Sequence, residues 1–101
     1  MVGVNIHLKR ICNKVHETAL EKGWWQDYRP TSECLMLIVT EVAEACESDR
    51  KGDEEGLKRE LADIIIRTAD LCEWLGIDIE YYVKRKMKIN KERPYKHGKR
   101  Y

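Results

Sequence analysis

The sequence predicts an all-α fold in which four helices form a small bundle-like unit. Apolar residues recur at helical spacing in four successive segments, and glycine, aspartate or proline residues separate those segments. Few β-branched runs occur outside the helical patterns. The chain has 101 residues, of which 43% are hydrophobic and 37% charged, so we expect one domain (residues 1–101) with a small core.

The first helix is expected over residues 4–22, with Gly23 as its C-terminal stop. Within it, His16 is a candidate ligand contact, although a histidine in such a pattern is more often a surface or core-edge residue. Trp24 and Trp25 are adjacent in the loop that follows. We expect one of them to fill a gap between helices and the other to offer a face on which a nucleobase can stack.

The second helix is expected over residues 32–49, with Thr31 or Ser32 as its cap. It is apolar around almost its whole circumference, which is typical of a buried helix. Glu41 and Glu44 nevertheless lie three residues apart on one of its faces. Buried carboxylates are costly unless they are paired or bind a metal, so a partner is expected opposite them.

The third helix is expected over residues 54–75 behind a cap at Asp53, and it repeats this spacing with Glu60 and Asp63. Two antiparallel helices joined by a short turn would bring all four carboxylates to one point. Oxygen ligands in that number suit Mg²⁺ or Mn²⁺ rather than zinc. The alternative is an exposed charged stripe in which Asp63 pairs with Arg67 one turn later.

The fourth helix is expected to begin behind a cap at Asp78 and to end near residue 91. Residues 84–101 carry a charge of +8, whereas residues 1–83 carry −7. The basic C-terminal tail, about residues 90–101, indicates an anionic partner or substrate, unless it is only a solvated chain end.

These charges indicate metal-assisted hydrolysis of a phosphoanhydride. Four carboxylates and two divalent ions together are neutral, so a triphosphate would need basic groups to attract it, and the tail could supply them. Metal ions polarise a phosphoryl group and activate a water that a carboxylate can orient. The sequence contains no P-loop and no Ser-His-Asp order that would favour another mechanism.

The cysteines and the apolar segments indicate in which cellular compartment the protein is expected. Cys12, Cys34, Cys46 and Cys72 lie among apolar helical residues without a Cys-x-x-Cys pair, so we expect buried free thiols rather than disulfides or a zinc site. No apolar run is long enough to span a membrane, and the N-terminus lacks the pattern of a signal peptide. A soluble, cytoplasmic protein is therefore expected.

The acidic residues form a pattern, Glu41-x-x-Glu44 and, after fifteen residues, Glu60-x-x-Asp63. This pattern resembles the Glu-x-x-Glu and Glu-x-x-Asp signature of MazG-like nucleoside triphosphate pyrophosphohydrolases. The similarity extends to Gly23-Trp24-Trp25, to residues 36–45, 60–67 and 75–78, and to Asn90-Lys-x-Arg93-Pro-Tyr-x-His97-Gly98-Lys99. The resemblance covers almost the whole chain and implies an all-α fold that assembles as a homodimer or homotetramer.

The resemblance also implies an activity and a set of site residues. The activity is Mg²⁺-dependent hydrolysis of a nucleoside triphosphate to the monophosphate and pyrophosphate, in house-cleaning or nucleotide-pool control, and Mn²⁺ could substitute. By resemblance the metal ligands are Glu41, Glu44, Glu60 and Asp63, of which Glu41 or Glu44 would also orient the attacking water. The implied phosphate contacts are Lys86, Asn90, Arg93, Tyr95 and Lys99, and the candidates for base binding are Asn13, His16, Trp24 and Trp25.

Three alternatives stay open at this point. One is a related pyrophosphatase with narrow specificity for dUTP or dCTP. Another is a family member that binds nucleotide without hydrolysing it. The third is a non-catalytic module that binds nucleic acid through residues 84–101, for which binding should depend strongly on salt.

Overall fold

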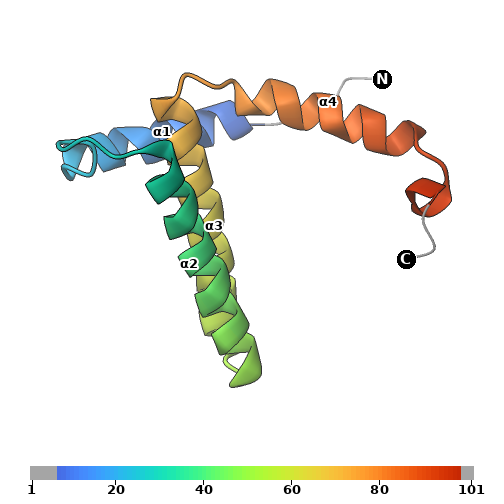
Figure 1. Ribbon diagram of the computed structural model, residues 1–101, viewed down its shortest axis with the longest axis horizontal. Coiled ribbons are helices and arrows are strands. Elements are labelled where there is room, and N and C mark those ends of the chain that lie inside the picture. The colour runs from blue at the N-terminus through green and yellow to red at the C-terminus, as the bar shows by residue number, and fades with distance from the viewer. Residues whose placement is uncertain (1–6, 99–101) are drawn as a thin grey trace.

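The computed structural model describes residues 7–98, and within this range the chain forms four α-helices and no strand. The helices are α1 (Leu8–Glu21), α2 (Thr31–Arg50), α3 (Glu54–Trp74) and α4 (Ile79–Glu92), and a short 3-10 helix, η1 (Tyr95–Gly98), follows them (Figure 1). The prediction of an all-α fold with four helices is confirmed.

The signals that end or begin a helix agree with the structure at three positions. Gly23 follows α1 with a φ of 80°, a left-handed conformation that favours glycine. The side chain of Asp53 accepts a hydrogen bond from the backbone N–H of Gly56 at 2.9 Å and caps α3. Asp78 does the same for α4, accepting from the N–H of Tyr81 at 3.2 Å. These local signals were sufficient because each depends on residues within one turn.

Two predictions about helix starts are wrong. The predicted first helix included His7, but His7 is the N-cap of α1, which begins at Leu8; residues 4–6 of that prediction lie outside the described residues. The cap expected at Thr31 or Ser32 is absent, because Pro30 holds the N-cap position and no side chain caps α2 there. The extended backbone of Pro30 leads directly into α2, so Thr31 and Ser32 already belong to the first turn of the helix.

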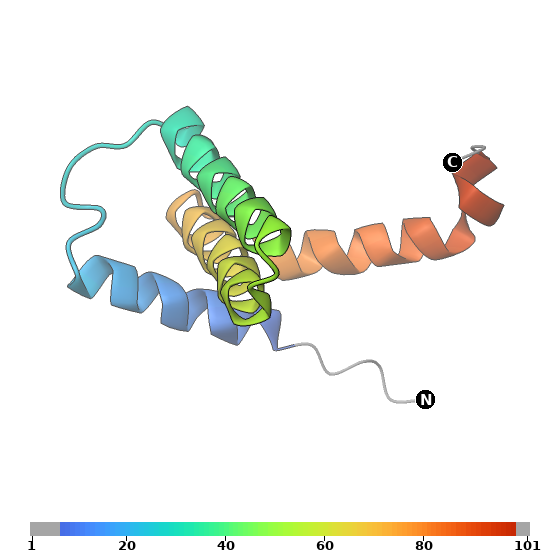
Figure 2. The same cartoon turned by 90° about the horizontal axis from the view of Figure 1, so that it is seen from below.

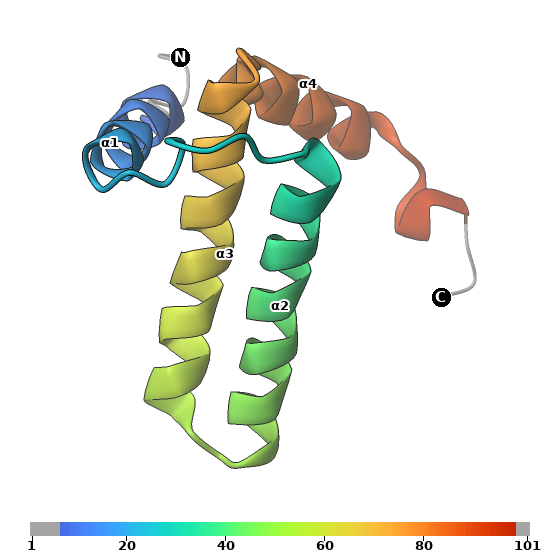
Figure 3. The ribbon, with the colours of Figure 1, turned by 60° about the vertical axis from the view of Figure 1, so that its left-hand side comes forward.

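The α2–α3 hairpin is the main structural unit, with its two long helices antiparallel and side by side (Figure 3). Helix α1 crosses α3 near the C-terminal end of α3 (Figures 1 and 2). The apolar residues buried in these three helices are mostly small: Cys12, Ala19, Cys34, Ala45, Ala69, Leu71 and Cys72. Small side chains allow the helices to approach closely, but they provide only a small core.

Helix α4 has no buried residue and extends away from the hairpin (Figures 1 and 2). The chain accordingly has a radius of gyration of 16.3 Å. A compact domain of this length would have a radius of gyration of about 13 Å. The bundle-like arrangement is therefore not completed within one chain, because α4 leaves the other three helices instead of packing along them.

The expectation that α2 is buried is wrong for the single chain. Leu35, Met36, Val39 and Val42 each expose about half of their surface, with fractions of 50%, 60%, 51% and 49%. The reason is that α2 packs on α3 along one side only, and α4 does not cover its other side. An apolar surface of this kind is unusual on a monomeric protein.

The cysteine prediction is confirmed for three of the four thiols. Cys12, Cys34 and Cys72 are free and buried, and burial raises the pKa of each. Cys46 is free but exposed, because it lies on the uncovered side of α2. Within the described part of the chain, none of the helices combines the length and the apolar character needed to cross a membrane.

Candidate functional site

Three of the four predicted acidic residues meet in the structure. Glu41 of α2 and Glu60 and Asp63 of α3 each offer a carboxylate oxygen, and these three oxygens lie within 4.8 Å of one another. They meet because the two helices of the hairpin run antiparallel, so that the i,i+3 faces of both helices point toward the same space. The spacing of the acids along the sequence was therefore a sound guide to their position in the fold.

Glu44, the fourth predicted acid, lies at the edge of this cluster. It is exposed, one turn after Glu41, and it does not belong to the three closely grouped residues. Its carboxylate still contributes to raising the pKa of Glu60, so the two groups are near each other. The structure thus gives Glu44 a more solvated place than the other three acids.

Glu60 retains its proton at a higher pH than an ordinary glutamate. A hydrogen bond shared with Glu41 is the main cause, and loss of hydration and the proximity of Glu44 add to it, raising the pKa of Glu60 to about 7. The Oε2 atom of Glu60 is also buried and has no hydrogen-bond partner among the described residues. An unsatisfied carboxylate oxygen within a cluster of hard oxygen donors fits a divalent cation such as Mg²⁺ or Mn²⁺.

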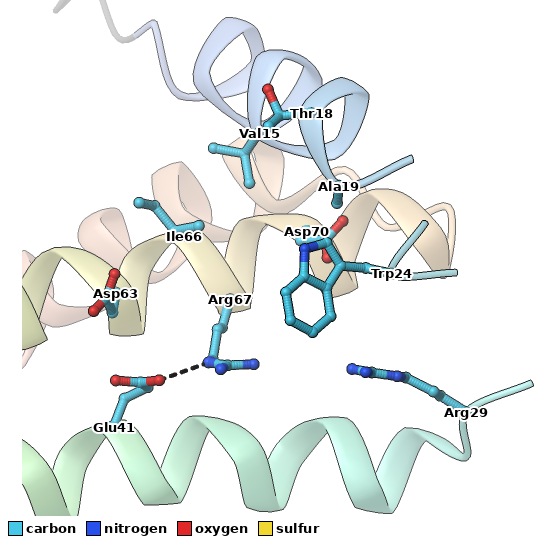
Figure 4. Close-up of a pocket in the computed structure, with 10 residues that line it drawn as sticks. All are labelled: Val15, Thr18, Ala19, Trp24, Arg29, Glu41, Asp63, Ile66, Arg67 and Asp70. Atoms are coloured by element: carbon cyan, nitrogen blue, oxygen red, sulfur yellow. Dashed lines mark hydrogen bonds and ion pairs between the residues drawn. The ribbon is translucent and has the colours of Figure 1, made fainter. Parts of the chain in front are cut away.

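The pKa of Glu41 is shifted in the opposite direction from that of Glu60. The hydrogen bond with Glu60 and a second one with Arg67 lower the pKa of Glu41. The Nε atom of Arg67 donates to Oε1 of Glu41 at 2.9 Å, and the side chain of Glu41 is only 10% exposed (Figure 4). Arg67 therefore reaches across to α2 instead of pairing with Asp63 on its own helix, and the charged-stripe alternative does not hold for this residue.

A cavity of about 280 Å³ opens beside the carboxylates. Glu41 and Asp63 lie at one end, Trp24 and Arg29 at the other, and Arg67 between them (Figure 4). The guanidinium carbon of Arg29 is 5.3 Å from the centre of the Trp24 ring. The remaining lining residues come from α1 and α3, and they are Val15, Thr18, Ala19, Ile66 and Asp70.

The two adjacent tryptophans have different environments. Trp25 is half-buried, stacks on Trp74 with ring centres 4.4 Å apart, and donates through Nε1 to both carboxylate oxygens of Asp70 at 3.0 Å. It is the tryptophan that fills a gap between helices, as expected of one of the pair. Trp24 is 52% exposed and faces the cavity, and its use as a stacking surface for a base stays a prediction.

The other candidates for base binding do not line the cavity. The Nδ1 atom of His16 lies 2.7 Å from Oδ1 of Asp70, so His16 belongs to the hydrogen-bond network that holds Trp25. Asn13 is exposed on α1. Within one chain, the structure therefore brings Trp24 alone among the four base-binding candidates to the lining of this cavity.

The predicted phosphate contacts lie apart from the carboxylates within one chain. Lys86 and Asn90 are exposed on α4, Arg93 and Tyr95 are exposed just beyond it, and none of them lines the cavity. Lys99 lies outside the described residues. Because α4 extends away from the hairpin, the acidic and basic parts of the predicted site are separate in the single chain (Figure 1).

Three residues of the site were not predicted to be functional from the sequence. Arg67 lies four residues after Asp63, and Asp70 lies three residues after Arg67, so the helical repeat places both on the face of the acids without assigning them a function. Arg29 gave no such signal, because its position depends on the path of the loop between α1 and α2.

Fold and site together define a class: an all-α protein with a carboxylate cluster, fit for divalent cations, on a helical hairpin beside an aromatic-walled cavity. The family model for the MazG nucleotide pyrophosphohydrolase domain matches residues 30–97, which is more than half of the chain. The chain belongs to this family. Searches of curated proteins and of solved structures gave no match.

Proposed function

We propose that this protein hydrolyses nucleoside triphosphates to the monophosphate and pyrophosphate in a reaction that depends on Mg²⁺, with Mn²⁺ as a substitute. The observation that supports this proposal most strongly is the convergence of Glu41, Glu60 and Asp63 beside a cavity with an aromatic wall. Membership of a family of nucleotide pyrophosphohydrolases agrees with it.

The chain supplies the groups that this reaction needs. Glu41, Glu60 and Asp63, with Glu44 at the edge, would hold the metal, which would polarise the phosphates and lower the pKa of a bound water. Glu41 or Glu44 would orient the attacking water. Water adds to the α phosphorus and gives a proton to that carboxylate, the bond between the α phosphorus and the oxygen bridging to the β phosphorus breaks, and pyrophosphate leaves. Trp24, at the far end of the cavity, would stack on the base.

The proposal includes a homodimer or homotetramer. Val39 and its apolar neighbours on α2 are about half exposed, and α4 has no buried residue, so both surfaces are available to a second copy of the chain. A partner in this position could also bring basic groups toward the carboxylates. Lys86, Asn90, Arg93, Tyr95 and Lys99 are the proposed phosphate contacts, and they would then act in the assembled protein.

The test is pyrophosphate release from a panel of ribo- and deoxyribonucleoside triphosphates, with Mg²⁺, with Mn²⁺ and with EDTA. Glu60→Gln should abolish release, because it removes a charged oxygen ligand from the cluster. Glu47→Gln is the matched control: it is the same substitution on the hairpin, at an exposed residue that pairs with Lys51. The ranking within the panel distinguishes a broad enzyme from one with narrow specificity for dUTP or dCTP.

Absence of release from every triphosphate by the folded protein would contradict the proposal. Salt-dependent binding to DNA or RNA that is lost with the basic tail would then support the nucleic-acid alternative. Metal-dependent binding of triphosphates without release would instead identify a non-hydrolysing family member.

A further inference from the structure

We propose that Arg67 acts as an internal counter-ion that holds Glu41 while no metal is bound, leaves it when a divalent cation binds, and then contacts the phosphates of the substrate. The last step rests on the proposed function, whereas the first two depend only on the carboxylate cluster. From the sequence, Arg67 was expected at most to form a surface ion pair.

Glu41 has two competing interaction partners, a divalent cation and Arg67. Glu41 belongs to the group of three carboxylates whose oxygens lie within 4.8 Å of one another. The same carboxylate accepts the Nε–H of Arg67 at 2.9 Å. A guanidinium and a divalent cation that approach one carboxylate compete for its oxygens, and their positive charges repel each other.

Arg67 also balances part of the negative charge of the carboxylate cluster. Among the described residues, Arg67 is the one basic side chain that forms an ion pair with any of the four acids. Glu41 is also the most buried of these acids, so it most needs a positively charged partner. Arg67 thus fills the electrostatic role that a metal ion would otherwise fill.

The cavity gives the Arg67 side chain room to move away from Glu41. That side chain is 35% exposed and lines the cavity between the acidic end and the end formed by Trp24 and Arg29 (Figure 4). A guanidinium released from Glu41 would therefore remain in the wall of the cavity. Its planar fork matches the oxygens of a phosphate group, which a triphosphate extending from the acids toward Trp24 would present.

Arg29 provides a matched control within the same cavity. It carries the same side chain and lies 5.3 Å from the Trp24 ring, at the opposite end from the acids. No carboxylate of the described residues lies within ion-pair distance of it. A change at Arg29 therefore tests the general effect of removing a positive charge from the cavity.

The experiment measures Mn²⁺ affinity without nucleotide, by calorimetry or electron paramagnetic resonance. We expect Arg67→Gln to bind Mn²⁺ about threefold to tenfold more tightly than the wild type, because the competing charge is gone. Arg29→Gln should retain the affinity of the wild type. Weaker or unchanged Mn²⁺ binding in Arg67→Gln would overturn the proposal, since Arg67 would then orient Glu41 for the metal instead of competing with it.

A second measurement uses the wild-type protein, in case Arg67→Gln does not fold. The Nε–H signal of Arg67 can be assigned by nuclear magnetic resonance from its loss in Arg67→Lys. In EDTA it should show the shift of a hydrogen-bonded guanidinium, move toward the position of a solvated arginine as Mg²⁺ is added, and move again with a non-hydrolysable triphosphate. A signal that stays in place throughout the titration would overturn the proposal.

The two proposals can fail separately. If the wild type releases no pyrophosphate but Arg67→Gln binds Mn²⁺ more tightly, the proposed function is wrong and the counter-ion role of Arg67 stands. If the wild type is active and Arg67→Gln binds Mn²⁺ with the same affinity as the wild type, the proposed function stands and the proposed role of Arg67 is wrong.

Discussion

The α2–α3 hairpin and α4 are both helical, yet they contribute differently to the proposed site. The hairpin brings Glu41, Glu60 and Asp63 together through contacts within one molecule. Helix α4 has no buried residue and keeps the basic groups apart from those acids. The comparison shows that the fold of one chain brings the acidic residues of the proposed site together, whereas it does not bring the basic residues of α4 to them.

The largest effect is expected at the hairpin. Asp63→Asn should lower kcat/KM for pyrophosphate release on the order of 100-fold or more, because an amide is a poor ligand for a divalent cation where a carboxylate is required. Steady-state assays with saturating Mg²⁺ would measure the loss. Activity within a few-fold of the wild type would show that the acids of α3 are not part of the catalytic site, and Glu47→Gln controls for a nonspecific loss of charge.

The second prediction concerns the apolar side of α2. Val39→Asp should shift the protein from an oligomer to a monomer, because it places a charge on a surface that we expect a second copy to cover. Light scattering after size-exclusion chromatography would measure the mass. Gln26→Asp adds the same charge at an exposed loop position and should leave the mass unchanged. A wild type that is already monomeric would contradict the assembly that we propose.

The third prediction tests the basic half of the site. Arg93→Gln should raise KM for the triphosphate about tenfold and change kcat less, because an arginine that contacts phosphate contributes mainly to binding. The control is Lys51→Gln, in the turn between α2 and α3, where Lys51 pairs with Glu47. It should leave KM unchanged. An equal effect of the two substitutions would indicate general attraction of charge instead of a specific contact.

The fourth prediction separates the two tryptophans. Trp25→Phe should lower the free energy of unfolding by about 1–2 kcal/mol, because it removes hydrogen bonds to Asp70 and weakens the stack on Trp74. Trp24→Phe should change stability less but raise KM. Chemical denaturation and steady-state kinetics would provide the two measurements, and a reversal of the two effects would exchange the roles assigned to these residues.

The smallest effect concerns pH. The folded protein raises the pKa of Glu60 from its ordinary value to about 7, so the fold favours the protonated form. The resulting stability is present below the ordinary pKa and is lost as the pH rises through about 7. In EDTA, Tm should therefore fall between about pH 5 and pH 8, and Glu60→Gln should reduce this slope. A wild-type slope in Glu60→Gln would show that another group is responsible.

With Mg²⁺ present, the expected pH dependence has the opposite sign. Metal binding requires Glu60 to lose its proton, so Mg²⁺ affinity should fall as the pH drops below about 7. Calorimetry at two pH values would measure this change. Affinity that does not vary with pH would indicate that Glu60 is not a ligand.

Local sequence signals predicted most of the fold. The helical periods, the caps at Asp53 and Asp78 and the turn at Gly23 were each decided within a few residues, and the structure agrees with them. The position of α4 could not be predicted, because its apolar residues indicate a face to be covered without indicating which surface covers it. The same ambiguity led to the wrong expectation of a buried α2.

The candidate site was predictable where the helical repeat determines it. The spacing of the acids correctly indicated that Glu41, Glu60 and Asp63 meet. The pairing of Arg67 with Glu41 depends on the distance between two helices, and the position of Arg29 depends on a loop, so neither could be derived from spacing alone.

The identity of the products tests the central claim most directly. A nucleoside triphosphate incubated with the wild-type protein and Mg²⁺ should yield the monophosphate and pyrophosphate in equal amounts by phosphorus nuclear magnetic resonance, and Asp63→Asn should leave nearly all of it intact over the same time. Formation of the diphosphate and orthophosphate, or products that form equally with Asp63→Asn, would contradict the assignment of a pyrophosphohydrolase site to the hairpin carboxylates.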